Sequence, residues 1–103
     1  MSLNPQQITN TKNELQANFE LSGLTRKQVA SDLQISLTKL DHLMTLTQES
    51  LNAPWILRNY LIEKVEDKGE KPVPFTALTG DWHRHWFLNS HLIDARQMSA
   101  GDN

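Results

Sequence analysis

The sequence predicts an all-α fold: one domain of four to five helices, with two short helices joined by a tight turn at its centre and a short C-terminal helix. Two observations predict it. Residues that cap helix N-termini recur before segments whose apolar residues follow helical spacing, and Gly or Pro marks the boundaries between these segments. A chain of 103 residues suits a single core. We expect the domain to cover residues 1–97, with residues 98–103 as a flexible tail.

The first helix begins near the N-terminus. Asn4 can act as its N-cap, and Pro5 follows at the first helical position, where the missing N–H costs nothing. Gly23 stands just beyond the last apolar residue and is typical of a helix end. The apolar residues expected to form its buried stripe are Ile8, Leu15 and Phe19.

Two further helix starts follow in series. Thr25 can cap a helix over residues 26–33, and Gln28, three residues later, can complete a capping box. Ser36 can cap a second short helix that extends to Thr45, which leaves two residues for the turn. Apolar residues three and four apart give both helices a buried face: Val29, Ala30 and Leu33 in the first, and Leu37, Leu40, Leu43 and Met44 in the second.

This segment, TRKQVASDLQISLTKLDHLM, resembles the helix-turn-helix of bacterial repressors. Ala30 stands where two steeply crossing helices need a small side chain. Such motifs usually have Gly in the turn, whereas this chain has Gln34, which in a left-handed conformation would cost roughly 1 kcal/mol. The resemblance implies binding of double-stranded DNA, with the N-terminal end of helix 36–45 in the major groove.

Each outward position of this helix pair has a possible role on DNA. Ser36 and the helix N-terminus suit a phosphate. Thr38 and His42 can hydrogen-bond base edges, and Leu37 could contact a thymine methyl group. Asp41 can accept from a cytosine amino group, but it repels phosphates. The alternative is that each is a solvated surface residue. The predicted DNA-binding residues are Arg26, Lys27, Ser36, Leu37, Thr38, Lys39, Asp41 and His42.

The charge of the chain argues for weak DNA binding by a single copy. The net charge is −2, and residues 1–50 carry four Lys or Arg against five Asp or Glu, a sum of −1. Since non-specific affinity comes from neutralised phosphates, we expect a homodimer, which doubles the contacts. The leading function is therefore a homodimeric transcriptional regulator. The rival is a protein–protein interaction module on the same scaffold without DNA contacts.

The fourth predicted helix, Trp55–Asp67, follows Asn52 and Pro54 and is closed by Gly69. Its apolar residues cover more than one face, so the helix must be buried on two sides, either inside the domain or against a second copy. We therefore expect the homodimer to form through helix 54–67 and the C-terminal region.

A connector and a short helix complete the chain. Two prolines make a regular helix impossible over residues 70–80, so this stretch is expected to be extended, with Phe75 and Leu78 on the core. Asp81 can then cap a short helix that places Trp82 and Trp86 on one face.

Taken whole, the chain also resembles a bacterial family of proteins of roughly this length known only as a domain of unknown function. The resemblance implies a stand-alone domain and supplies no activity. The segments that carry it are WILRNYL at residues 55–61, Pro74-Phe75-Thr76 with Leu78, Trp86-Phe87-Leu88-Asn89, and Ile93-Asp94.

Three histidines, His83, His85 and His91, suggest a metal site, with Asp81 or Asp94 as a further ligand. Their spacing does not bring all three together on a helix, and the chain has no cysteine. The alternative is histidines packed beside the neighbouring aromatic residues, and we predict no metal.

We also expect a protein that is not an enzyme and has no cofactor. No nucleophile–base pairing is recognisable, and the four glycines are too scattered to form a phosphate-binding loop. No apolar run approaches the length of a membrane span, and the N-terminal residues MSLNPQQ lack a signal-peptide pattern. The expected location is the cytoplasm, with no membrane contact.

Overall fold

The computed structural model describes residues 4–46, 52–79, 88, 93, 94 and 96. Within these residues the chain forms four α-helices and no strand, so the predicted all-α class is confirmed. The short helix expected after Asp81 and the tail 98–103 lie outside the described residues. The helices are α1 (Pro5–Ser22), α2 (Arg26–Leu33), α3 (Leu37–Met44) and α4 (Ala53–Asp67).

Local side-chain caps fix where α1 and α2 begin. The Asn4 side chain accepts from the backbone N–H of Gln7 at 2.8 Å, and the Gln7 side chain accepts from the N–H of Asn4 at 3.0 Å, which completes a capping box. At α2, Thr25 accepts from the N–H of Gln28 at 3.1 Å, as predicted. The Gln28 side chain does not reach back, however; it donates to Asp32 at 2.8 Å. The capping box predicted at α2 is therefore only half formed.

The turn between α2 and α3 closes on a residue in the left-handed conformation. Gln34 has φ 57° and ψ 47° and donates its N–H to Ser31 O at 3.1 Å. Ile35 donates to Ala30 O at 2.9 Å, which completes a Schellman arrangement. Ser36 then caps α3 through the N–H of the third helical residue, at 3.0 Å. Gln34 thus occupies the backbone conformation for which glycine is the usual choice.

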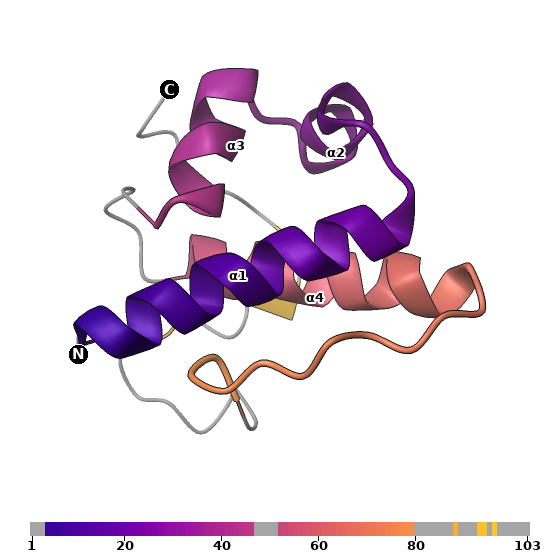
Figure 1. Ribbon diagram of the computed structural model, residues 1–103. Helices are drawn as coiled ribbons and strands as arrows, with labels where there is room; N and C mark the ends of the chain where they lie inside the picture. Colours follow the sequence, from indigo (N-terminus) through magenta and orange to yellow (C-terminus); the bar gives the residue numbers. More distant parts are fainter. Residues whose placement is uncertain (1–3, 47–51, 80–87, 89–92, 95, 97–103) are drawn as a thin grey trace.

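Helices α1 and α4 pack against each other, and α3 contacts both of them as well as α2 (Figure 1). Helix α4 is the centre of the core, and its apolar residues are almost fully buried within one chain except Ile62, which is partly buried and packs against the core. The surface that motivated a homodimer through helix 54–67 is therefore not exposed, and the homodimer itself stays a prediction. The buried α4 residues are Ala53, Pro54, Trp55, Ile56, Leu57, Tyr60, Leu61 and Val65.

The chain after α4 runs in an extended path (Figure 1). Phe75 and Leu78 are buried in the core, which confirms the prediction for this connector. Of the stripe predicted for α1, Leu15 is fully buried and Phe19, partly buried, packs against the core, while Ile8 is only partly buried. The buried residues of α1 are Thr11, Leu15, Asn18 and Ser22.

Asn18 is buried because it binds the backbone of the connector. Its Nδ2 donates to Val73 O at 3.0 Å and to Glu14 O at 2.9 Å, and its Oδ1 accepts from Val73 N at 2.8 Å. One turn earlier, the Glu14 carboxylate accepts from the N–H of Thr76 at 3.1 Å and from its hydroxyl at 2.8 Å. These contacts pair both backbone groups of Val73 and the N–H of Thr76, and they hold the extended segment on α1.

Candidate nucleic-acid interface

Helices α2 and α3 lie together on one side of the α1–α4 pair (Figure 1). The side of α3 turned away from the core carries Leu37, Thr38, Asp41 and Thr45, which are all exposed. Positions three and four residues apart share one face of a helix, so these side chains form a continuous strip. Leu37 is 42% exposed and is the one large hydrophobic residue found exposed in the described part of the chain.

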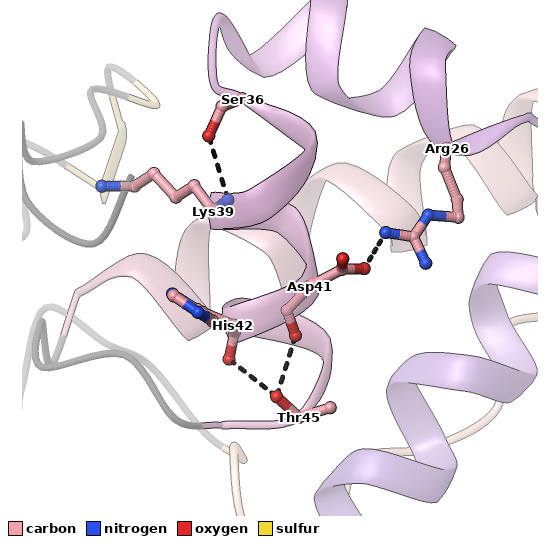
Figure 2. A network of polar contacts seen from close by, with 6 residues as sticks. All are labelled: Arg26, Ser36, Lys39, Asp41, His42 and Thr45. Atoms are coloured by element: carbon pink, nitrogen blue, oxygen red, sulfur yellow. Dashed lines mark hydrogen bonds and ion pairs between the residues drawn. The ribbon is translucent and has the colours of Figure 1, made fainter.

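An ion pair links the first residue of α2 to the middle of α3. Arg26 Nη2 contacts Asp41 Oδ1, and Figure 2 shows the two side chains pointing toward each other between the helices. The two side chains are 51% and 53% exposed, so solvent screens the pair and its contribution to stability is small. The consequence for binding is larger: the charge of Arg26 is compensated in the free protein.

Lys39 is not where the sequence predicts. It was expected on the outward face of α3, but only 1% of the residue is exposed. Figure 2 shows its side chain leaving α3 on the opposite side from Arg26. The reason is its position four residues before Leu43, on the buried face, where the aliphatic stem of a lysine can pack like a hydrophobic side chain. Lys39 is therefore not available to contact DNA in this structure.

The remaining predicted residues keep places compatible with the prediction. Lys27 is exposed beside Arg26 in the first turn of α2. The Ser36 hydroxyl serves as the N-cap of α3, and His42 is partly buried. The hydroxyl of Thr45 donates to the carbonyl oxygens of Asp41, at 2.9 Å, and of His42, at 3.4 Å, which closes the C-terminal end of α3 (Figure 2).

A tether between α4 and α2 was not predicted. The hydroxyl of Tyr60, on α4, donates to Asp32 Oδ2 at 2.5 Å, while Asp32 Oδ1 accepts from Gln28. Burial, followed by this hydrogen bond to a carboxylate, raises the pKa of Tyr60 above its usual value. The tether fixes α2 relative to the core helix. The sequence signal for it is weak, since Asp32 looks like any polar residue on a solvated face.

Cations surround the ring of Tyr60. The Lys64 ammonium lies 5.6 Å and the Arg96 guanidinium 5.9 Å from its centroid. Arg96 also pairs with Glu63 at 2.7 Å, and this hydrogen bond lowers the pKa of Glu63. The C-terminal end of the described chain is thereby attached to α4.

Arg58 holds the end of the connector. Its Nε donates to Leu78 O at 2.7 Å, and its guanidinium lies 5.2 Å from the centroid of Trp55 and 5.6 Å from that of Phe75. Burial lowers its pKa. The arrangement explains why an arginine occurs between the buried apolar residues of this helix.

The three histidines considered as metal ligands, His83, His85 and His91, lie outside the described residues. Among the residues that the structure does describe, no group of three or more potential metal ligands comes together. None of the described helices combines the length and apolar character that crossing a membrane would require.

These features define a small all-α domain in which two short, capped helices are presented on a core built from α1 and α4. The chain belongs to the bacterial family described as "Uncharacterized protein conserved in bacteria (DUF2316)", whose pattern matches residues 1–89. This confirms the uncharacterised bacterial family suggested by the sequence. Comparisons with curated proteins and with solved structures found no match.

Proposed function

We propose that this protein binds double-stranded DNA through α2 and α3 and regulates transcription in the bacterial cytoplasm. The observation that carries the proposal is the exposed strip of α3, which starts at a capped N-terminus and follows a turn closed by left-handed Gln34. A second helix held by such a short turn can enter the major groove with its N-terminal end first. The fold alone does not imply this function, so the proposal depends on the side chains.

The side chains suggest a division of roles. Lys27 and the N-terminal end of α3 at Ser36 suit phosphates, which position a protein on DNA without specifying sequence. Leu37 and Thr38 suit the base edges, the first through a thymine methyl group and the second through its hydroxyl. His42 stands at the rim of this surface. Lys39 has no part in the proposed interface, because it is buried.

Two-fold pairing remains part of the proposal. Of the three cations in α2 and α3, Lys39 is buried and Arg26 is paired, so one copy offers few charges to phosphates. Two copies on a symmetric site would double the contacts. The dimer surface would have to come from a part of the chain other than the apolar face of α4.

The test is an in vitro selection from a random duplex library at low ionic strength, followed by sequencing of the retained DNA. The expected result is an enriched motif with two-fold symmetry, whose half-site spacing would give the dimer geometry. Retention without enrichment would contradict sequence-specific regulation. If folded protein, verified by circular dichroism, retains no DNA, the proposal is refuted.

The rival is a protein-interaction module, and three observations favour it: the burial of Lys39, the compensation of Arg26 by Asp41, and the exposure of Leu37. An exposed apolar residue on a nearly neutral surface suits a protein partner better than a polyanion. A matched pair of variants separates the two functions. If the first proposal is correct, Lys27→Gln should weaken DNA binding. If the protein binds a protein partner instead, Leu37→Ser should weaken that binding more than Lys27→Gln does.

A further inference from the structure

The Arg26–Asp41 ion pair lies where it could take part in base recognition. This inference rests on the DNA-binding function proposed above. Asp41 is in the middle of the exposed strip of α3, four residues after Leu37 and three after Thr38. It therefore shares a face with the two residues best placed for base edges. A carboxylate at this position would ordinarily oppose binding, because every phosphate nearby repels it.

Arg26 offsets this repulsion between the Asp41 carboxylate and the phosphates. The guanidinium contacts one carboxylate oxygen, Oδ1, so that the pair carries no net charge and costs little when it approaches the phosphates. The pair also joins two helices, which restricts the orientation of the carboxylate to the side of α3 that faces α2 (Figure 2).

We propose that Asp41, positioned and charge-compensated by Arg26, is a specificity-determining residue that accepts a hydrogen bond from the amino group of a cytosine in the major groove. Of the four bases, cytosine is the one whose major-groove edge offers only a donor, so a carboxylate is its natural partner. Thymine in that place offers a carbonyl oxygen and a methyl group, which would leave the carboxylate unpaired. Arg26 acts through Asp41 as a positioning residue.

The alternative within the same site is that Arg26 itself contacts a base, with Asp41 as its support. Arginine commonly pairs with guanine, so the two assignments predict different bases for different residues. They also predict different sensitivities to mutation. The base preference belongs to Asp41 in our proposal and to Arg26 in the alternative.

The experiment repeats the duplex selection with the full chain and with D41N, R26Q and the control K27Q. The wild-type protein should enrich cytosine at one position in each half-site. D41N should lose that preference, a change on the order of tenfold in relative affinity, or exchange it for adenine, which asparagine pairs with. R26Q should keep the preference for cytosine but bind more weakly, because the carboxylate is no longer compensated.

K27Q provides the matched control, because Lys27 is the exposed neighbour of Arg26 in the same helical turn. Loss of a phosphate contact should weaken binding to all sequences alike, reduce the slope of log affinity against log salt by about 1, and leave the enriched motif unchanged. All three altered residues are exposed, so urea denaturation should show folding free energies close to that of the wild type.

Three outcomes would overturn the inference. An enriched motif that D41N leaves unchanged would remove Asp41 from base recognition while leaving the DNA-binding function intact. A preference lost in R26Q but kept in D41N would assign the base contact to Arg26. If the wild-type protein enriches no sequence, the proposed function fails and this inference fails with it.

Discussion

Replacement of Asn18 by alanine should destabilise the domain far more than the same replacement of an exposed asparagine on α1. The substitution removes three hydrogen bonds: two donated by Nδ2, to Val73 O and Glu14 O, and one accepted by Oδ1 from Val73 N. Each such bond contributes a net free energy of about 1 kcal/mol, so the expected loss is about 2 to 3 kcal/mol. For a domain of this size, each kcal/mol lowers the melting temperature by about 4–8 °C.

The control is Asn13→Ala, at an exposed position of the same helix. Both variants gain the same helix propensity from alanine, about half a kcal/mol, so their difference isolates the tertiary contacts of Asn18. Urea denaturation followed by far-ultraviolet circular dichroism measures both free energies of unfolding. Amide hydrogen exchange gives a local readout, because the N–H of Val73 should lose protection in Asn18→Ala and keep it in Asn13→Ala.

An isosteric change at Asn18 perturbs the same contacts. Asn18→Asp keeps an acceptor for Val73 N but turns a donor into a carboxylate facing two carbonyl oxygens, so it should cost at least as much as alanine at neutral pH. If Asn18→Ala lies within about 0.5 kcal/mol of Asn13→Ala, the contacts with the connector do not hold the fold together and the reasoning is refuted.

Three further predictions concern the free energy of unfolding and the pKa of the single tyrosine. Tyr60 should titrate above 10.0 in the folded chain and near that value in urea, and the ultraviolet absorbance of tyrosinate measures both. Since the pKa of Tyr60 is raised by folding, its contribution to stability is complete below pH 10.0 and is lost as the pH rises above that value through the folded pKa. A normal pKa in the folded chain would contradict the hydrogen bond between Tyr60 and Asp32. Lys39→Ala should cost about 2 kcal/mol through lost packing while Lys27→Ala stays within about 0.5 kcal/mol; equal values in urea denaturation would refute the burial of Lys39. Gln34→Gly should stabilise by about 0.5–1 kcal/mol by relieving the left-handed conformation, whereas Gln34→Ala should not raise the melting temperature.

Features set by short-range contacts could be predicted from the sequence. The caps at Asn4, Thr25 and Ser36 depend on a side chain and a backbone N–H three residues later, so the residue type alone indicates them. Gly23, with φ 69°, ends α1 for a similarly local reason. The burial of Phe75 could be predicted because it is an apolar residue that directly follows a proline in the connector.

The features that the sequence did not predict share a different cause. Lys39 was predicted on the outward face of its helix, and the burial of Asn18 was not predicted at all; both residues are buried, since each is positioned by contacts that a residue-type pattern does not contain. Asn18 faces the core because its amide pairs with a backbone 55 residues away. Lys39 shares the buried face with Leu43, and an apolarity pattern cannot register the packing of an aliphatic stem that ends in a charge. The surface expected to form the homodimer through α4 was inferred from a pattern that counts apolar residues without showing how many neighbours cover them; these residues are buried within one chain, and the homodimer itself stays a prediction.

The burial of Lys39 changes the electrostatics of α2 and α3 in a way that bears on both proposed functions. Together these helices contain three cations and two carboxylates, and with Lys39 buried the two that remain exposed are Arg26 and Lys27. Because Asp41 compensates Arg26, attraction to phosphates in general is weak on this surface. If α3 discriminates between DNA sequences, it must do so through contacts to base edges, where geometry rather than net charge decides the free energy of binding. A surface of this kind is poorly suited to non-specific DNA binding, so what remains is either recognition of a defined sequence or a partner that is not a polyanion.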